Sequence, residues 1–371
     1  MSKRFDVAVI GGGPTGTAAG IALARAGRSV AVLERSHYDR VRTGEILPPA
    51  ARLPLIELEA WDRFIAEGHA PSPGILSAWG QDEPYENHFI FNPYGHGWHL
   101  DRRRFDAMLA SAAEEAGASV CRGARVTSCR PVASRGWQVE FITDGERRHF
   151  QAAFLVYATG RACVLARWQG ARRIFYDRLV GLVGFFPARS AERKCNYQTL
   201  IEAAEDGWWY SAWLPDSRLV VGYMTDADLI PKGRVSASEY WQSRLEQARN
   251  TQSRIDGCVP ETGLRSVAAN SYMIDCIAGN NWLAVGDAAI AFDPLSSQGT
   301  YHALKSGLLA ARAIENCLVG DQTALGEYAR EIQKRFGQYL SMRAVHYGQE
   351  QRWSSSAFWQ RRRRDKVDHT L

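Results

Sequence analysis

The chain has 371 residues, of which 46% are hydrophobic and 23% charged, and a formal net charge of +5. This length and composition predict one large domain or two subdomains with a sizeable core, and they exclude an intrinsically disordered protein. No apolar run is long enough to cross a membrane, and no secretory signal is visible at the N-terminus. We therefore expect a cytoplasmic protein with no membrane partner.

Metal, disulfide and nucleic-acid chemistry are not indicated by the sequence. The seven cysteines are scattered without a C-x-x-C pair, which predicts reduced, mostly buried thiols. No H-E-x-x-H or comparable spacing suggests a metal site. The densest basic run, QRRRRDK at 360–366, is interpreted as a solvated helix end, because no nucleic-acid-binding motif accompanies it.

The first predicted elements are a strand, a glycine turn, a helix and a second strand, in the stretch FDVAVIGGGPTGTAAGIALARAGRSVAVLER (5–35). Gly11, Gly13 and Gly16 match G-x-G-x-x-G, which permits a tight turn, close approach of a pyrophosphate and close helix packing. Glu34 ends the second strand, where a carboxylate can accept hydrogen bonds from ribose hydroxyls. The pattern predicts a dinucleotide site. Three neighbouring residues complete the predicted contacts of this half: Pro14, Thr15 and Arg35.

The middle of the chain predicts a second, discontinuous unit. Helical periodicity covers 105–116, and strands are expected at 118–126 and 137–142. Aromatic-rich stretches, such as WWYSAWLPDSRLVVGYMTD at 208–226, alternate like antiparallel strands. The expected division is a nucleotide-binding domain at 1–74, 101–165 and 266–320, a substrate domain at 75–100 and 166–265, and a charged helical segment at 321–371.

Towards the C-terminus, NWLAVG (281–286) predicts another buried strand, which puts Asp287 at the edge where open α/β sheets bind ligands. An acid there can hold the ribityl hydroxyls of a flavin. Residues 296–300 offer backbone N–H groups at the start of a helix over 301–314, and these suit the flavin edge that turns negative on reduction. NAD needs no such second site, so the pattern predicts FAD. The predicted contacts in this half are Gly286, Asp287, Pro294, Gln298, Gly299 and Thr300.

These segments, with LVYATG at 155–160 between them, resemble the FAD-binding frame of the para-hydroxybenzoate hydroxylase-like superfamily. That superfamily includes aromatic monooxygenases, tryptophan halogenases and geranylgeranyl reductases. The resemblance implies an α/β fold with a Rossmann-type FAD-binding domain and a second domain containing a mostly antiparallel sheet. It also implies that Arg42 and Arg102 lie near the FAD phosphates or the flavin, and that Val126 touches adenine through its backbone.

Three departures argue against halogenation, although the chain resembles the tryptophan halogenase branch. Those enzymes carry a catalytic lysine after G-E-x-x-x-P, whereas this chain has no lysine between Lys3 and Lys194. Their W-x-W-x-I-P is replaced by WYSAWLP at 209–215, and their Ser-Thr-Gly by SQG at 297–299. In addition, the Asp-Gly pair by which single-component hydroxylases serve NAD(P)H is Thr159-Gly160 here, so we expect electrons from a separate flavin reductase or free reduced flavin.

The favoured interpretation is therefore an FAD-dependent monooxygenase that hydroxylates an indole-type aromatic through a C4a-hydroperoxyflavin. A base is needed to accept the substrate proton, and His99 and His96 in NPYGHGWHLDR (92–102) are the candidates, with Gln298 as a further catalytic residue. A histidine in such a strand can equally be a hydrogen-bonded structural residue.

The stretches SAWGQDEP, NPYGHGWHLDRRRFD and GWWYSAWLP are similar to accessory flavoproteins that oxygenate a tryptophan of a partner protein during tryptophylquinone biogenesis. The substrate implied is an aromatic small molecule or a tryptophan-containing peptide or protein. Alternatives left open are a halogenase, a geranylgeranyl reductase-like enzyme, and a non-catalytic flavin-binding partner. Five tryptophans could stack on an indole or belong to the core: Trp79, Trp98, Trp208, Trp209 and Trp213.

Overall fold

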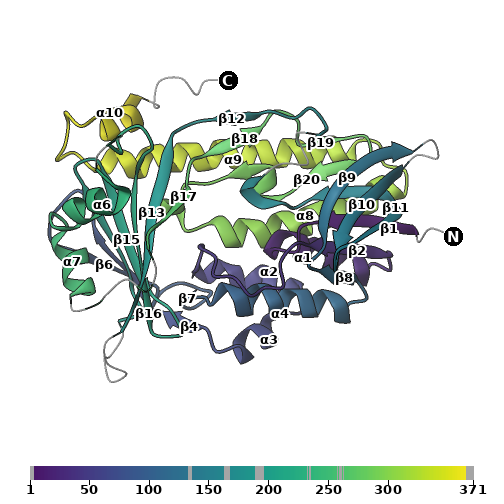
Figure 1. Ribbon diagram of the computed structural model, residues 1–371, viewed down its shortest axis with the longest axis horizontal. Helices are drawn as coiled ribbons and strands as arrows, with labels where there is room; N and C mark the ends of the chain where they lie inside the picture. Colours follow the sequence, from purple (N-terminus) through teal and green to yellow (C-terminus); the bar gives the residue numbers. More distant parts are fainter. Residues whose placement is uncertain are drawn as a thin grey trace.

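Two β-sheets lie side by side along the long axis of the molecule, and long helices run between them (Figure 1). The structure is a computed structural model. The residues outside its description are 1–3, 133–135, 163–167, 189–195, 232, 234, 257, 259, 260, 262 and 365–371.

The first sheet contains the segment predicted to bind a dinucleotide, and its central strands are parallel. β1 (Arg4–Ile10) pairs in parallel with both β2 (Val30–Glu34) and β11 (Glu146–Tyr157), and β11 pairs with β20 (Trp282–Ala284). Strands from opposite ends of the chain therefore become near neighbours. The remaining strands are β8 (Ser119–Arg122), β9 (Arg125–Val132), β10 (Gly136–Thr143) and β19 (Ala278–Gly279).

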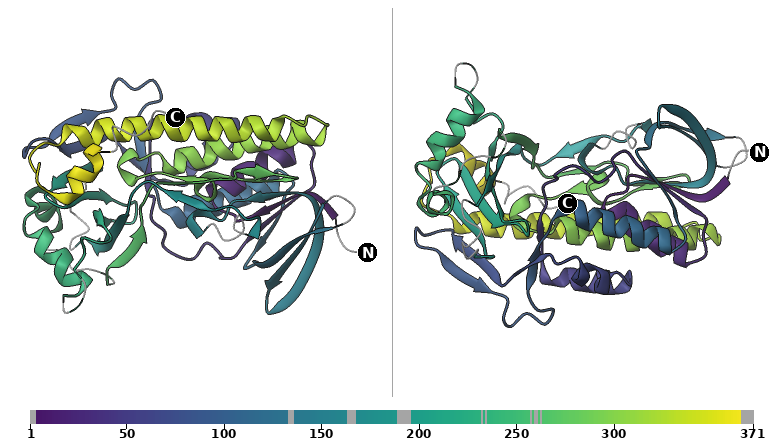
Figure 2. Two further views of the ribbon diagram at one scale, coloured as in Figure 1. Left: turned by 90° about the horizontal axis from the view of Figure 1, so that it is seen from above. Right: turned by 60° about the horizontal axis from the view of Figure 1, so that its bottom comes forward.

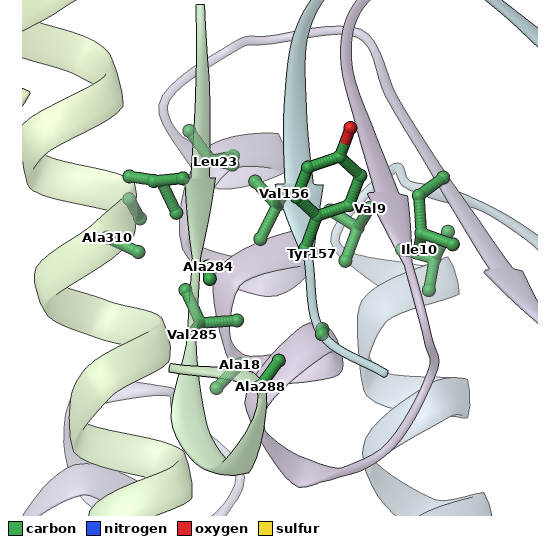
Figure 3. Packing of buried hydrophobic residues seen from close by; sticks show 14 of the residues in the cluster. Val9, Ile10, Ala18, Leu23, Val156, Tyr157, Ala284, Val285, Ala288 and Ala310 are labelled. Carbon is green, nitrogen blue, oxygen red and sulfur yellow. The ribbon is translucent and has the colours of Figure 1, made fainter. Parts of the chain in front are cut away.

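Helices α1 (Pro14–Arg25) and α8 (Gly299–Leu318) pack against this sheet, and the contact depends on small residues (Figure 3). Val9, Val156 and Ala284 supply the fully buried strand side of the core. A Cβ atom added at Gly307 of α8 would lie 2.5 Å from the carbonyl oxygen of Thr15, so the two helices approach backbone to backbone. This contact brings the starts of α1 and α8 to one edge of the sheet.

The second sheet has seven strands and is antiparallel except for one parallel pair, β14 with β5. Its strands follow the order β17 (Arg265–Ala268), β13 (Leu179–Pro187), β16 (Arg218–Asp226), β15 (Gly207–Trp213), β14 (Thr199–Ala204), β5 (Gly74–Ala78) and β6 (Tyr85–His88). Successive side chains point to opposite faces of a strand, so Trp208 and Trp209 belong to two different core clusters. Both faces of this sheet are therefore packed with aromatic side chains.

Two small sheets and short helices connect the large sheets. The first joins β3 (Ile46–Leu47), β7 (Gly97–His99) and β4 (Ala70–Ser72), and the second joins β12 (Arg173–Phe175), β18 (Tyr272–Ile274) and β21 (Ile290–Ala291). The other α-helices of the described residues are α2 (Arg52–Glu57), α3 (Trp61–Ala66), α4 (Arg102–Glu115), α6 (Ala237–Leu245) and α7 (Arg249–Ile255), with α9 (Ala324–Gln349) and α10 (Ala357–Arg364) towards the C-terminus.

Helix α9 ties the two halves of the molecule together, and it runs along nearly the whole length of the views in Figure 2. Its first turns, including Ile332 and Phe336, belong to the core of the FAD-binding half. Its last turns carry Tyr347 into the core beneath the seven-stranded sheet, where α10 also packs. The two halves thus share one continuous helix.

The expected fold class is confirmed, and several finer expectations need correction. The stretch 118–126 is two strands, β8 and β9, because the chain turns at Gly123 (φ 71°). The helix expected at 301–314 begins at Gly299 and ends at Leu318. The domain boundaries stay a prediction.

The expectations about the cysteines and about the basic run near the C-terminus were wrong. Among the described cysteines only Cys129 is buried, and Cys276 is exposed, so these thiols are not mostly buried. Cys163 and Cys195 lie outside the described residues. The basic run at 361–364 is not only a solvated helix end, because Arg362 is 3% exposed and forms a 2.8 Å ion pair with the buried Asp226.

Candidate FAD-binding and active site

The turn between β1 and α1 is shaped by glycines and leaves space at the helix start. Gly11 has φ 112°, and a Cβ atom added there would lie 2.3 Å from the carbonyl oxygen of Ala158. One added at Gly16 would lie 1.9 Å from the carbonyl oxygen of Gly11, whereas one at Gly13 would meet no atom within 4 Å. No side chain caps α1, so the amides at its start, beside Pro14 and Thr15, remain available to an anion.

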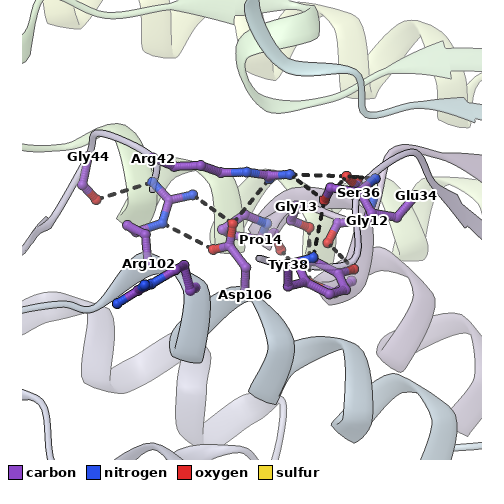
Figure 4. A network of polar contacts seen from close by, with 12 residues as sticks. Gly12, Gly13, Pro14, Glu34, Ser36, Tyr38, Arg42, Gly44, Arg102 and Asp106 are labelled. Atoms are coloured by element: carbon purple, nitrogen blue, oxygen red, sulfur yellow. Dashed lines mark hydrogen bonds and ion pairs between the residues drawn. The ribbon is translucent and has the colours of Figure 1, made fainter. Parts of the chain in front are cut away.

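Glu34 reaches back to this turn from the end of β2 (Figure 4). One carboxylate oxygen accepts the Gly12 N–H at 2.8 Å, and the other accepts the Ser36 hydroxyl at 2.6 Å and the Arg42 guanidinium at 3.0 Å. Burial acts to raise the pKa of Glu34, but the Ser36 and Gly12 hydrogen bonds and the charge of Arg42 outweigh it, and the pKa lies below its ordinary value. The carboxylate is therefore ionised and fixed. Arg35, next in sequence, is exposed.

Arg42 and Arg102 share one buried carboxylate, that of Asp106 (Figure 4). Arg102 donates twice to Asp106, at 3.0 and 3.1 Å, and Arg42 lies 3.2 Å from it. Arg102 also donates to the Thr43 and Gly44 carbonyl oxygens at 2.7 and 3.2 Å. The structure thus brings both predicted arginines together beside the glycine turn. Asp106 was missed, although its spacing of four residues from Arg102 on one helix was a readable signal.

The second half of the site is built on the turn after β20. Gly286 has φ 53°, and a Cβ atom added there would lie 2.3 Å from the Thr15 hydroxyl oxygen, so this turn touches the start of α1. The Asp287 carboxylate lies 3.5 Å from Arg161, and 36% of its side chain remains exposed, which leaves room for another partner. Arg161 also donates to the Phe292 carbonyl oxygen at 2.7 Å. Arg161 was not among the predicted residues, although it directly follows the LVYATG segment.

The start of α8 completes this half. Gln298 is the helix N-cap residue and makes no side-chain capping bond, and a Cβ atom at Gly299 would meet nothing within 4 Å. Thr300 donates to the Gly44 carbonyl oxygen at 3.3 Å, which joins α8 to the segment that carries Arg42. Pro294, partly buried, opens the short turn before Ser297, whose φ is 51°.

The backbone N–H groups and carboxylates of the site suit both the nucleotide end and the flavin end of FAD. Two helix starts without side-chain caps, α1 and α8, meet at one sheet edge, with a fixed carboxylate at Glu34 and a partly open one at Asp287. Val126 lies in β9, half-buried, close in the chain to β8, which pairs with β2. These observations support the predicted contacts, whose individual roles stay predictions.

The two histidines considered as bases are placed differently. His99 is fully buried, with one ring nitrogen 2.8 Å from the Trp213 carbonyl oxygen and the other 2.9 Å from the Thr199 hydroxyl. Burial lowers the pKa of His99 to about 4. His96 is exposed, and its ring meets that of Trp98 edge to face with centroids 4.4 Å apart. Neither contact set involves the segments around Glu34, Asp287 or α8, and their catalytic assignment stays a prediction that this geometry does not favour.

Comparison with known proteins identifies the family. The model of the FAD binding domain matches residues 4–342. The chain belongs to this family. FAD-binding-domain relatives include LodB of Marinomonas mediterranea, named as an FAD-dependent oxidoreductase, which is 30% identical over 97% of this chain and 97% of its own.

Two solved structures are similar over nearly the whole length. The myxobacterial chondrochloren halogenase CndH superposes with a TM-score of 0.86 at 28% identity, over 97% of this chain and 86% of its own. Peptidyl tryptophan dihydroxylase QhpG, essential for tryptophylquinone cofactor biogenesis, superposes with a TM-score of 0.82 at 26% identity, over 97% of this chain and 79% of its own. This FAD-binding-domain protein is therefore an FAD-dependent oxidoreductase, of a group that contains both halogenases and a tryptophan hydroxylase.

Two kinds of feature are absent from the described residues. No helix among them has the length and apolar character needed to cross a bilayer. Within the same residues, no cluster of three or more histidine, cysteine or acidic side chains is arranged to hold a metal ion.

Proposed function

We propose that the protein is an FAD-dependent monooxygenase that hydroxylates an indole-type substrate, the tryptophan side chain of a partner peptide or protein. The observation that carries this proposal is the similarity to the peptidyl tryptophan dihydroxylase along 97% of the chain. The relationship to halogenases is as extensive, but the absence of lysine between Lys3 and Lys194 removes the residue by which tryptophan halogenases direct the halogenating species.

The flavin supplies oxygen activation when it is reduced, and the protein supplies binding and orientation. Glu34 and the glycine turn would hold the nucleotide end of FAD, Asp287 the ribityl chain, and the start of α8 the flavin edge that becomes negative on reduction. Arg42 and Arg102, both anchored on Asp106, would add positive charge beside these groups.

The test is product mass after turnover of tryptophan-containing peptides with chemically reduced FAD, in the presence of ¹⁸O₂. We expect the peptide to gain one or two oxygen atoms carrying the label. Chloride and bromide are varied in parallel, because a halogenase would give a product with the halogen isotope pattern, and that result would overturn hydroxylation. Turnover without oxygen would instead identify a reductase.

Electron supply is proposed to come from a separate flavin reductase. Thr159 stands where single-component hydroxylases have aspartate, and among the described residues its buried hydroxyl has no hydrogen-bond partner. NADH and NADPH added to the FAD-loaded protein alone should therefore leave the flavin oxidised, and addition of a flavin reductase should start turnover. Rapid bleaching of the flavin by either nucleotide without a reductase would contradict this part of the proposal.

A further inference from the structure

Glu45 is a buried acid at the junction between the two large sheets. Its side chain is 3% exposed, and its carboxylate accepts a hydrogen bond of 3.0 Å from the Tyr210 hydroxyl on β15 of the seven-stranded sheet. No ion pair of Glu45 with a basic side chain is found in the described part of the chain. A buried carboxyl group whose hydrogen-bond donors, the Tyr210 hydroxyl and backbone N–H groups, are all neutral is costly to keep ionised, so its place requires an explanation.

A small cavity separates Glu45 from solvent. Its volume is about 10 Å³, close to the space that one water molecule needs. Glu45 forms one part of its wall, together with apolar side chains such as Phe185 and Leu214. Asp216 and Arg103 form another part and keep 32% and 36% of their side chains exposed, so one water molecule would connect the buried acid with the surface.

Glu45 also lies next to the flavin side of the site. The preceding carbonyl, of Gly44, accepts hydrogen bonds from Thr300 in the first turn of α8 at 3.3 Å and from Arg102 at 3.2 Å. Burial raises the pKa of Glu45, while hydrogen bonds and the Arg102 charge oppose the shift. This raised pKa favours the protonated form, and the group lies beside the start of α8, where the negative edge of reduced flavin is expected.

We propose that Glu45 is the residue that passes protons between solvent and the buried flavin site. The inference rests on the proposed function for its chemistry. Anionic reduced FAD, O₂, the arene C–H and one proton give oxidised FAD, the hydroxylated arene and water, so one proton must enter the site in each turnover. Glu45 donates that proton and is reprotonated through the water-sized cavity. Without substrate, anionic reduced FAD, O₂ and one proton give oxidised FAD and hydrogen peroxide, so this reaction also consumes one proton per turnover.

The charged and titratable groups near Glu45 come from its own segment, from the start of α4 and from the β15–β16 hairpin, and they affect its titration. They are Arg42 of its own segment, Asp101, Arg102 and Arg103 at the start of α4, and Tyr210, Asp216 and Arg218 from β15, the following turn and β16. Asp101 and Asp216 are paired with Arg103 and Arg218 at 2.9 and 2.6 Å. Among these carboxylates, Glu45 is therefore the one suited to carry a proton.

The experiment follows reoxidation of bound FAD. Wild-type protein and the variants Glu45→Gln, Tyr210→Phe and Glu202→Gln are loaded with FAD, reduced anaerobically with dithionite and mixed with oxygenated buffer from acidic to alkaline pH. Flavin absorbance gives the rate, and hydrogen peroxide and peptide products are measured separately. Glu202 is a matched control. It is a buried glutamate, 7% exposed, on β14 of the sheet that carries Tyr210, and it accepts hydrogen bonds from the start of α7.

The wild-type rate should fall as pH rises through the ionisation of Glu45, because the proton donor is lost. Glu45→Gln should be about 100-fold slower, with little pH dependence. Tyr210→Phe should move the fall to higher pH, because the carboxylate loses a hydrogen bond that stabilises its charged form. Glu202→Gln should match the wild type. A structural role for Glu45 would not move the pH profile in this way.

A wild-type rate and pH profile in Glu45→Gln would overturn the proposal. If that variant does not retain FAD, an unshifted profile in Tyr210→Phe overturns it instead. Because the peroxide-forming reaction needs the same proton, the assay works without a peptide. A Glu45-dependent rate with no hydroxylated peptide would therefore reject the proposed substrate while supporting the role of Glu45.

Discussion

The FAD-binding half and the seven-stranded sheet differ in how their helices pack against their neighbours: glycines allow close backbone contacts in the first, whereas large aromatic side chains fill the space in the second. In the first, the closest contacts are between backbones where side chains are missing, as at Gly16 and Gly307. In the second, aromatic rings fill the space, as where Trp209 lies 4.6 Å from Tyr223 and 5.1 Å from Trp241. The FAD-binding half is therefore specified by close backbone contacts at glycines, whereas the second sheet also depends on matching of large side chains from distant segments.

Among the substitutions that test this comparison, Gly16→Ala should cause the largest loss of stability. The new Cβ atom would lie 1.9 Å from the Gly11 carbonyl oxygen, a backbone atom that cannot rotate away. We expect a loss of stability above about 4 kcal/mol and no FAD-loaded protein. Thermal unfolding of the FAD-free protein and fluorescence titration with FAD measure the two effects.

Gly13→Ala is the matched control for this substitution. A Cβ atom there meets nothing within 4 Å, so the FAD-free protein should unfold like the wild type. Its FAD affinity should nevertheless fall, because the added methyl group occupies the side from which the pyrophosphate approaches. Equal destabilisation by the two substitutions would show that the turn is not the backbone-limited contact described here.

Trp209→Ala tests the other half, where side-chain volume is decisive. Trp209 is 0% exposed, and its removal leaves a cavity between Tyr223 and Trp241. We expect a loss of about 3–5 kcal/mol in the free energy of unfolding, measured by denaturant titration. Phe91→Ala is the control, because this aromatic is 94% exposed and its removal should change stability by less than about 0.5 kcal/mol. Similar losses in both variants would argue against the packing described.

The same contrast explains how much could be predicted from the sequence. The glycine turn, Glu34 and Asp287 were readable, because each follows a buried strand at a spacing fixed by local geometry. The antiparallel character of the second sheet was readable from alternation. The assignment of Trp208 and Trp209 to opposite faces agrees with their burial in the core, which was one of the two interpretations left open.

What escaped prediction depends on contacts between distant segments. Arg161 is held by hydrogen bonds to carbonyl groups more than a hundred residues later in the chain. Glu45 is held by a hydrogen bond from Tyr210 of the seven-stranded sheet. The buried pairing of Arg362 with Asp226 likewise joins residues that no local pattern connects. Such partners become visible only when the fold brings them together, because a sequence motif records spacing along one segment.

The pH dependence of stability should distinguish the structural and catalytic interpretations of His99. Its pKa in the folded protein is about 4, against an ordinary value of 6.5, because burial disfavours the charged ring. Between pH 6.5 and pH 4 the unfolded chain therefore binds a proton that the folded protein does not. The free energy of unfolding falls as the pH is lowered through this range. The contribution of His99 to this fall is about 3 kcal/mol.

His99→Gln removes this titration. Denaturant unfolding at several pH values should show a shallower loss of stability in the variant than in the wild type, between neutral pH and pH 4. Product formation at neutral pH, normalised to FAD-loaded protein, should be retained if His99 is structural. An unchanged stability profile together with lost product formation would restore His99 as a catalytic candidate.

Tyr347→Phe should have a smaller effect on stability, and it acts where the two halves meet. The Tyr347 hydroxyl donates to the buried Asp293 carboxylate at 2.7 Å and accepts the Trp208 indole N–H at 2.9 Å. Its loss removes the hydrogen bonds of the Asp293 Oδ2 atom and the Trp208 indole N–H and should cost about 2 kcal/mol. Because one partner precedes α8 and the other lies in the second sheet, FAD release and tryptophan fluorescence should no longer change together during unfolding.

Tyr328→Phe provides the control for that separation. Tyr328 lies on the same helix, α9, and its hydroxyl donates to the Ala284 carbonyl oxygen at 2.9 Å, within the FAD-binding half alone. This variant should lose about 1 kcal/mol, but its two signals should still change together, as in the wild type. If Tyr328→Phe separates the signals and Tyr347→Phe does not, the coupling runs through the packing of α9 on the first sheet. The Trp208–Tyr347–Asp293 hydrogen bonds would then be ordinary core contacts.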